Sequence, residues 1–152
     1  MAEKDLERLI SGMSPKLREG EYYIGSFDES GLMALAGYLE HILCIFREEE
    51  GLSVIFAAGV LGELGPLSRK APAGPFSLIS LTINSDLLAV GFMAEISAAL
   101  AKEKIPCNAF SAYYHDHLLV PSGMKENTMR CLLRLAKTAS PQGVQNDRKR
   151  KP

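Results

Sequence analysis

The 152-residue sequence has no tryptophan, few cysteines and no apolar run that approaches a membrane span. A transmembrane helix needs about 20 consecutive apolar residues, and the opening residues Met1–Asp5 lack the basic start and apolar stretch of a secretory signal. Cys44, Cys107 and Cys131 are scattered and form no CxxC pair, which disfavours a disulfide framework and a zinc site. We expect a cytoplasmic protein with no cofactor and no membrane association.

Motifs of common enzyme classes are also missing, because the sequence has no P-loop, no GxGxxG after a strand and no GxSxG elbow. Ser111, His115 and Asp116 offer the side chains of a hydrolase triad, but adjacent strand residues point to opposite faces. His115 and His117 are spaced to share a metal ion, yet the third histidine, His41, lies in the other half of the chain. A hydrolase or metalloprotein built on residues 115–117 is the weaker alternative, and we expect neither catalysis nor a metal.

Charge is distributed unevenly along the chain. Asp and Glu outnumber Lys and Arg before residue 137, whereas the end of the sequence is basic and carries the cluster Arg148–Lys151. A mildly acidic folded part argues against a nucleic-acid-binding face. Residues 139–152 are predicted to be a disordered basic tail, whose cluster either aids solubility or serves as a nuclear address.

One order of predicted elements occurs twice: strand, helix, hairpin, helix. Apolar residues alternate in the strands and recur at helical spacing in the helices. A Pro- and Gly-containing stretch, 68–75, separates the two sets as a linker. The first set comprises a strand at 22–27, a helix near 32–39, a hairpin of 41–47 and 52–56, and a helix at 57–64. The second comprises a strand at 76–83, a helix behind 84–86, a hairpin of 107–113 and 118–120, and a helix after 121, with Met129, Leu132, Leu133 and Ala136 facing inward.

This rhythm predicts an α+β fold of two ferredoxin-like units, in which helices cover one face of each antiparallel sheet. Leu6, Leu9, Ile10 and Met13 recur at helical spacing and predict a short amphipathic helix before the first unit. The expected organisation is an N-terminal helical extension at 1–13, a first unit at 14–72, a second unit at 73–138 and the tail at 139–152.

Two segments resemble a known family. Ser111–Pro121, with the sequence SAYYHDHLLVP, is similar to the second-hairpin signature of tandem ACT-type proteins, and Phe46–Leu52 is similar to the first-half hairpin of the small microbial members. The resemblance extends over roughly residues 14–138 and includes the ACT modules of the cytosolic arginine sensor and of aspartate kinases. It implies two ACT units, no catalysis and a small ligand, usually an amino acid, at an interface. The chain has two units where the arginine sensor has four, and a glycine common in the first turn of aspartate-kinase modules is absent from residues 84–87.

The resemblance also implies where the ligand binds. The turn after the first strand of the second unit and the following hairpin would supply the contacts, with Asp116 matching an acidic ligand-contacting residue of the arginine sensor. His115 and His117 are expected to pack at the interface or to bond the ligand. The predicted ligand-binding residues are Asn84, Ser85, Asp86, Leu87, Ser111, Tyr113, His115, Asp116 and His117.

The chemistry of these residues suits a zwitterion. A helix beginning near Ser85 would present free N–H groups to a carboxylate, and Asp116 would bind the ammonium group. Helix capping by residues 84–86 and a local turn at Asp116 are the alternatives that need no ligand. We expect an amino-acid-binding regulatory module that forms a homodimer, with a ligand-free protein-interaction scaffold as the alternative function.

Overall fold

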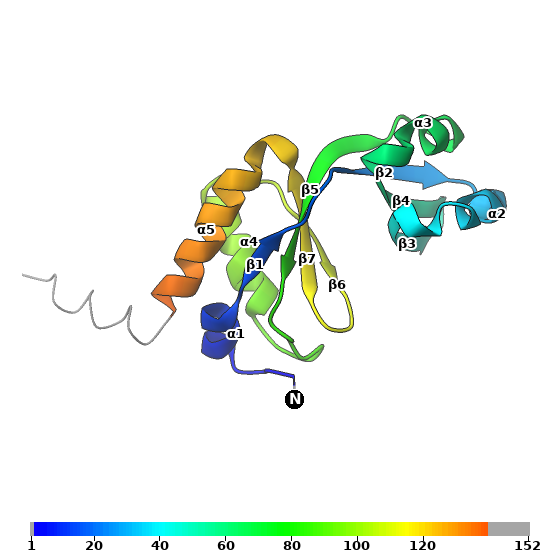
Figure 1. Cartoon of the computed structure of the whole chain (residues 1–152). Helices are drawn as coiled ribbons and strands as arrows, with labels where there is room; N and C mark the ends of the chain where they lie inside the picture. The colour runs from blue at the N-terminus through cyan, green and yellow to red at the C-terminus, as the bar shows by residue number, and fades with distance from the viewer. Residues whose placement is uncertain (1, 140–152) are drawn as a thin grey trace, which may run out of the picture. The chain divides into compact units, whose positions relative to one another are not determined.

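The computed structural model describes residues 2–139, which form two compact units. We call residues 19–77 the contiguous unit. We call the other the split unit, because its described residues, 2–18 and 78–139, come from both ends of that range. The elements of each unit can be followed by label and colour in Figure 1. The predicted basic cluster at Arg148–Lys151 lies outside the described residues.

The contiguous unit is an antiparallel sheet with short helical segments between its strands. Its strand order is β3-β4-β2-β5, and β5 contributes its first residues here. The strands are β2 (Tyr22–Phe27), β3 (Ile42–Glu48), β4 (Gly51–Ala57) and β5 (Ala73–Leu81); the helices are α2 (Leu32–Ala36) and α3 (Leu61–Leu64), with 3-10 turns at Glu29–Gly31, Leu39–His41, Ala58–Val60 and Gly65–Leu67.

Alternation along β4 explains how this unit closes its core. Leu52, Val54 and Phe56 are 3%, 0% and 0% exposed, and successive strand residues point to opposite faces. They pack in one cluster with Leu35 of α2 and Leu64 of α3. Each such side chain contributes about 1.5–3 kcal/mol when it leaves water, so even these short helices are fixed to the sheet.

The split unit takes the last residues of β5 as its first strand and continues through the second half of the chain. Its strand order is β1-β5-β7-β6, and β1 pairs antiparallel with β5 in the register Pro15↔Leu81 and Leu17↔Ile79. The strands are β1 (Pro15–Leu17), β6 (Asn108–Ser111) and β7 (Asp116–Pro121); the helices are α1 (Leu6–Gly12), α4 (Phe92–Lys102) and α5 (Lys125–Thr138), with a 3-10 turn at Ser122–Met124.

Helices α1, α4 and α5 share one core with the sheet of this unit. Ile79 and Leu81 of β5 and Leu118 and Val120 of β7 point the same way, because each pair is two residues apart. The helices cover them with side chains that are at most 4% exposed: Leu9, Ile10, Phe92, Ile96, Leu100, Cys131 and Leu132. The N-terminal helix is therefore part of the second half's core.

The predicted α+β class, the repeated element order and the antiparallel sheets with packed helices are confirmed. The compact units divide the chain at different points from the expected linear boundaries, because α1 and β1 pack with the second half. The predicted linker at 68–75 is partly wrong, since β5 already begins at Ala73 and pairs there with Ile24. Leu133 does not face inward: it is 45% exposed, and Thr128, Cys131 and Leu132 define the buried face of α5.

Two further expectations can be compared with the described residues. None of their helices has the length and apolar character needed to cross a bilayer. Cys44, Cys107 and Cys131 are all free thiols, and burial raises the pKa of Cys107 and of Cys131. A raised thiol pKa reduces the reactive thiolate, so Cys131 acts as a small apolar side chain within the core.

Candidate functional site

Asp116 is a buried carboxylate that is held by two serines. It is the first residue of β7 and is only 6% exposed. Ser85, in the segment after β5, donates its hydroxyl to Asp116 Oδ2 at 2.7 Å, and Ser111, the β6 residue paired with Asp116, donates to Oδ1. Ion pairs of the described residues include none with Asp116. Neutral hydroxyls thus solvate a buried negative charge that has no cationic partner in this part of the chain.

The predicted helix start at Ser85 is wrong, because residues 84–91 form an irregular loop and α4 begins at Phe92. Asp86 favours the loop, since its Oδ1 accepts the N–H of Leu88 at 2.9 Å and its carbonyl accepts that of Ala89. Such local bonds compete with helix formation. Gly91 then adopts φ 92°, a left-handed conformation suited to glycine, and its carbonyl accepts the first bond of α4.

The start of α4 nevertheless lies beside Asp116. Ser85, Ser111 and Asp116 line a pocket of about 140 Å³ together with the loop and the first turn of α4. The helix residues in its wall are Phe92, Met93 and Ala94. No side chain caps this helix, and the first N–H groups of a helix lack intrahelical partners and carry partial positive charge. An acidic residue and an uncapped helix start therefore line the same pocket.

A wider hollow adjoins this pocket along the loop. It measures about 330 Å³ and shares Ser85, Asp86 and Leu87 with the first pocket. Its remaining walls come from Ala2, Asn84, Tyr113 and Tyr114. The two tyrosine rings are 74% and 62% exposed and stack edge to face with centroids 4.8 Å apart. Asn84, Leu87 and Tyr113 thus lie around the outer hollow, and Asp116 lies in the inner pocket.

The two histidines of the segment have other contacts. His115 Nδ1–H donates to the Ile83 carbonyl at 3.2 Å, and His117 Nδ1 is hydrogen-bonded to Ser80 Oγ at 3.0 Å. Neither lines the pocket that contains Asp116. Partial burial lowers the pKa of His117, with His115 and Arg18 adding to the effect and Asp116 opposing it. These histidines support the strands and the loop around the site.

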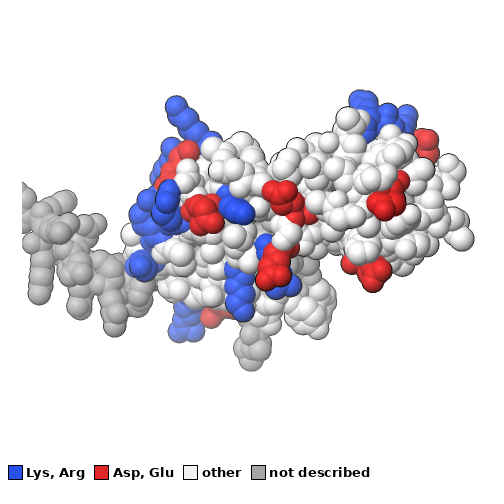
Figure 2. All heavy atoms as spheres, turned by 45° about the horizontal axis from the view of Figure 1, so that its top comes forward, with Lys and Arg blue, Asp and Glu red and all other residues white. Residues whose placement is uncertain are grey.

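The described residues also limit other chemistries. Residues 2–139 contain no group of three or more His, Cys, Asp or Glu side chains positioned for one metal ion. On the face shown in Figure 2, Lys and Arg side chains are interspersed with Asp and Glu, and no continuous basic surface is drawn there. This arrangement does not resemble the clustered positive charge of a nucleic-acid-binding face.

Sequence reasoning brought Ser85, Asp86, Leu87, Ser111 and Asp116 to one place, and the structure has them around one pocket. It missed Gly91 and the residues Phe92–Ala94, because the cap-like residues 84–86 suggested an earlier helix start. The sequence does contain a signal for the later helix start. Gly91 comes directly before Phe92, and Phe92, Ile96 and Leu100 recur at helical spacing. The pocket also lies within the split unit, whereas a seam between units or chains was expected.

Comparisons with known proteins agree with the two halves of the fold. Models of the ACT domain match residues 1–60 and 75–134. No curated protein matches the chain. Among solved structures, a Vibrio cholerae protein of unknown function, VC0802, called a possible transport protein, is 34% identical over 88% of this chain and 97% of its own, with a TM-score of 0.72.

Regulatory parts of aspartate kinases share the fold. The regulatory subunit of aspartate kinase from Thermus flavus is 15% identical over 81% of this chain and 97% of its own, with a TM-score of 0.56. Aspartokinase III from E. coli, solved with aspartate and ADP, is 18% identical over 80% of this chain but only 33% of its own, with a TM-score of 0.61. These likenesses concern the arrangement of the strands and helices.

Proposed function

The chain belongs to the ACT domain family as a tandem ACT protein, and we propose that it is a non-enzymatic regulatory module that binds a small amino acid beside Asp116. ACT domains typically bind amino acids in a regulatory role. The observation that supports this function here is that the buried Asp116 and an uncapped helix start line the same pocket.

The ammonium group of the ligand fits the Asp116 end of the pocket. A carboxylate has about four acceptor positions, and the hydroxyls of Ser85 and Ser111 use two of them. Burying an unpaired charge is costly, so a bound cation would relieve the charge on Asp116. A charge-assisted hydrogen bond contributes about 1.5–3 kcal/mol.

The carboxylate of the ligand fits the α4 end. N–H groups at the start of a helix bind anions, because they lack partners and lie at the positive end of the helix dipole. Phe92–Ala94 form that start and line the pocket. The two ends of the pocket therefore complement the opposite charges of a zwitterion.

The dimensions of the pocket favour a small ligand. Its volume is about 140 Å³, and a dry cavity of about 150 Å³ holds a molecule of the size of benzene. A longer side chain would extend along Leu87 into the outer hollow, where Asn84 and Tyr113 offer an amide and an aromatic face.

Thermal unfolding with each of the twenty amino acids at 10 mM, followed by calorimetry of those that act, tests the proposal. Ligand that binds only the folded state must raise stability by mass action, by about 2.7 kcal/mol at a hundred times Kd. We expect one or a few small amino acids to raise the melting temperature. If none does so at millimolar concentration, the proposal fails.

Homodimerisation and a cytoplasmic location complete this proposal. ACT domains commonly dimerise, and the three free thiols suit a reducing compartment. Sedimentation of the purified chain with and without the active amino acid would measure the oligomeric state. A monomer at every concentration tested would contradict the dimer.

A second candidate function is ligand-free docking of a partner protein. It is favoured by exposed apolar side chains on the loop and the neighbouring turn, namely Leu87, Leu88, Val90, Tyr113 and Tyr114, which are between 62% and 84% exposed. The Ser85→Ala, Asp116→Ala double variant separates the two functions. A scaffold would keep its partner with this variant, whereas an amino-acid sensor would lose its response.

A further inference from the structure

The pocket loop is fastened to residues that lie far from it in sequence. Glu3 donates its N–H to the Asn84 carbonyl, and its own carbonyl accepts the N–H of Asp86, both at 2.9 Å. These two bonds form a parallel bridge between Glu3 and Ser85. Lys4 Nζ lies 3.5 Å from Asp86 Oδ2, next to the same bridge. Asn84 and Asp86, the loop residues on either side of Ser85, are therefore bonded to residues 3 and 4.

The other end of the loop meets helix α1. Gly91 precedes α4, and a Cβ atom added to it would lie 3.2 Å from Leu6 Cδ2. Leu6 itself packs against the core that contains Phe92. Residues 3–6 thus contact both ends of the loop whose middle residues, Leu87 and Ala89, line the pocket.

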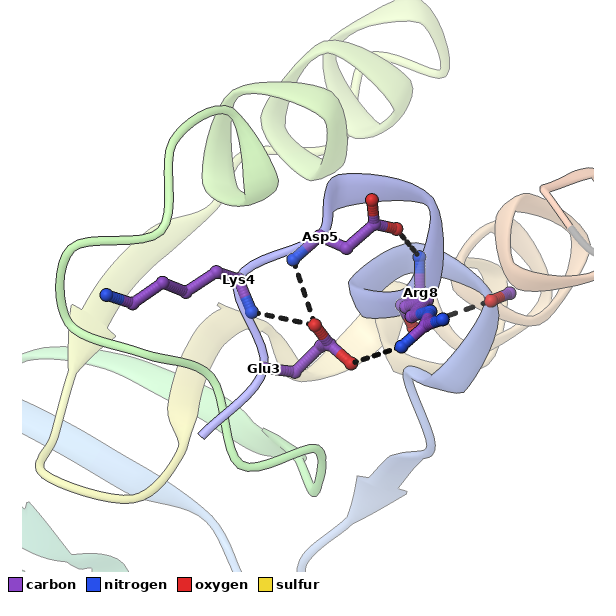
Figure 3. A network of polar contacts seen from close by, with 5 residues as sticks. Glu3, Lys4, Asp5 and Arg8 are labelled. Atoms are coloured by element: carbon purple, nitrogen blue, oxygen red, sulfur yellow. Dashed lines mark hydrogen bonds and ion pairs between the residues drawn. The ribbon is translucent and has the colours of Figure 1, made fainter. Parts of the chain in front are cut away.

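This segment has its own polar network, drawn in Figure 3. Glu3 Oε1 accepts the N–H groups of Lys4 and Asp5, and Oε2 lies 3.9 Å from Arg8 Nη1. The two amides and Arg8 together lower the pKa of Glu3. Asp5 caps α1 by accepting the N–H of Arg8 at 2.9 Å, and Leu9 and Ile10 anchor the helix in the core. The segment is therefore connected to a fixed element.

We infer that residues Glu3–Leu6 act as a strap that positions the loop 84–91, so that contacts outside the pocket set the affinity for its ligand. Lys4 has a second effect, because its charge offsets that of Asp86, an acidic wall residue of the pocket. Without Lys4, Asp86 would repel the carboxylate of the ligand more strongly. Glu3, Lys4 and Leu6 are positioning residues in this scheme, which rests on the proposed amino-acid site.

The test uses the full chain, a deletion of residues 2–4 that keeps the Asp5 cap, and the milder variant Lys4→Ala. Lys16→Ala is the matched control, because Lys16 is an exposed lysine on β1 of the same unit. Amide hydrogen exchange, measured by NMR, is followed at two residues. The N–H of Asp86 is bonded to the Glu3 carbonyl and reports the strap, and Leu119, a fully buried β7 residue paired with Asn108 of β6, is the reference outside the loop. Calorimetry measures the affinity of the pocket for the amino acid that most stabilises the wild type.

We expect the deletion to raise the exchange rate of the Asp86 amide about two- to tenfold and to raise the Kd for the amino acid by a similar factor. Each change is equivalent to the loss of one net hydrogen bond. Leu119 should be unchanged, and Lys4→Ala should weaken binding less than the deletion does. Unchanged exchange at Asp86, or faster exchange with unchanged affinity, overturns the inference.

Two other outcomes are informative. If the deletion raises the exchange rates of Asp86 and Leu119 equally, the Lys4→Ala variant becomes the test. Lys4→Ala and Lys16→Ala proteins with the same exchange rate at Asp86 and the same affinity would overturn the inference. A wild type that binds none of the twenty amino acids refutes the proposed function instead, and positioning of the loop is then judged by exchange at Asp86 alone.

Discussion

Ser85 donates its hydroxyl to Asp116 Oδ2 at 2.7 Å and so joins the pocket loop to the first residue of β7, 31 positions away in sequence. This bond links the strap, the loop and the carboxylate: Glu3 holds the backbone on both sides of Ser85, and Ser85 holds Asp116. Folding of the split unit and preparation of the pocket therefore depend on the same contacts.

Replacing Ser85 with alanine should destabilise the protein. The change leaves Oδ2 of a buried carboxylate without its hydroxyl donor, and such a loss costs about 1–3 kcal/mol. Urea unfolding would measure the effect. Ser30→Ala is the control, because Ser30 is exposed in the contiguous unit and should change stability by less than about 0.5 kcal/mol. Equal stability of the two variants would show that water replaces the lost hydroxyl.

Asp116→Asn should affect the ligand more than the fold. The amide has nearly the same shape as the carboxylate, and its oxygen still accepts a hydroxyl, but it carries no charge to bind an ammonium group. Loss of a charge-assisted bond of about 1.5–3 kcal/mol weakens binding roughly ten- to hundredfold.

Calorimetry with the amino acid that stabilises the wild type would measure this loss. Asp28→Asn provides the control, since Asp28 occupies the turn after the first strand of the contiguous unit, β2. If the Asp116→Asn variant bound the amino acid with wild-type affinity, Asp116 would not be the residue that binds the ammonium group.

The element order could be predicted from sequence, because it depends on local features. Asp116 was singled out differently, by the resemblance of residues 111–121 to tandem ACT-type proteins, and its role in binding stays a prediction. Apolar residues alternate along β4 and β7 and recur at helical spacing along α4 and α5, so these patterns can be recognised within short stretches of sequence. The start of α4 could not be predicted in this way. Asn84, Ser85 and Asp86 have the composition of a helix cap, but Ser85 bonds to Asp116 and Asp86 bonds to Leu88 and Lys4, and these contacts favour a loop.

The position of the N-terminal residues could not be predicted from the sequence either. A short amphipathic helix predicts that Leu9 and Ile10 are buried, but it does not identify the partner surface. The N-terminal segment is held to the second half of the chain by the pairing of Pro15 with Leu81 and of Glu3 with Ser85, and by the core that Leu9 and Ile10 share with α4 and α5. Such long-range pairings are determined by packing of the whole unit.

His117 should make stability depend on pH below neutrality. Its pKa lies below the ordinary 6.5 because of partial burial, with His115 and Arg18 adding and Asp116 opposing. Between the two values the unfolded chain binds more protons than the folded one, so stability rises with pH. It should therefore fall as the pH drops below about 6.5, and this contribution becomes constant below the folded-state pKa.

Melting temperatures between pH 5 and pH 8 would test this prediction. His117→Gln should flatten the slope, because glutamine does not titrate and can still bond Ser80 Oγ. His41→Gln, which removes an exposed imidazole from the contiguous unit, is the control. If the melting temperature of the His117→Gln variant depended on pH as strongly as that of the wild type, another titrating group would be responsible.

Gly51→Ala should strongly destabilise the contiguous unit. Gly51 begins β4 with φ 133°, a conformation that L side chains rarely adopt, and an added Cβ would lie 2.4 Å from the Phe27 carbonyl oxygen. Left-handed backbone costs about 1–2 kcal/mol for a residue with a Cβ, and forced overlap in a packed region adds about 1–3 kcal/mol. The obstacle is the backbone of β2, which pairs with β4 at Phe27↔Leu52 and cannot move without loss of that register.

Gly31→Ala is the matched control, because Gly31 has a φ of −73° and no atom within 4 Å of an added Cβ. Urea unfolding should show a loss of about 2–5 kcal/mol for Gly51→Ala and a change within about 0.5 kcal/mol for Gly31→Ala. Because the pocket beside Asp116 is built only from residues of the split unit, any Gly51→Ala protein that remains folded should bind the amino acid with wild-type affinity. Weakened binding by the folded variant would mean that the contiguous unit contributes to the site.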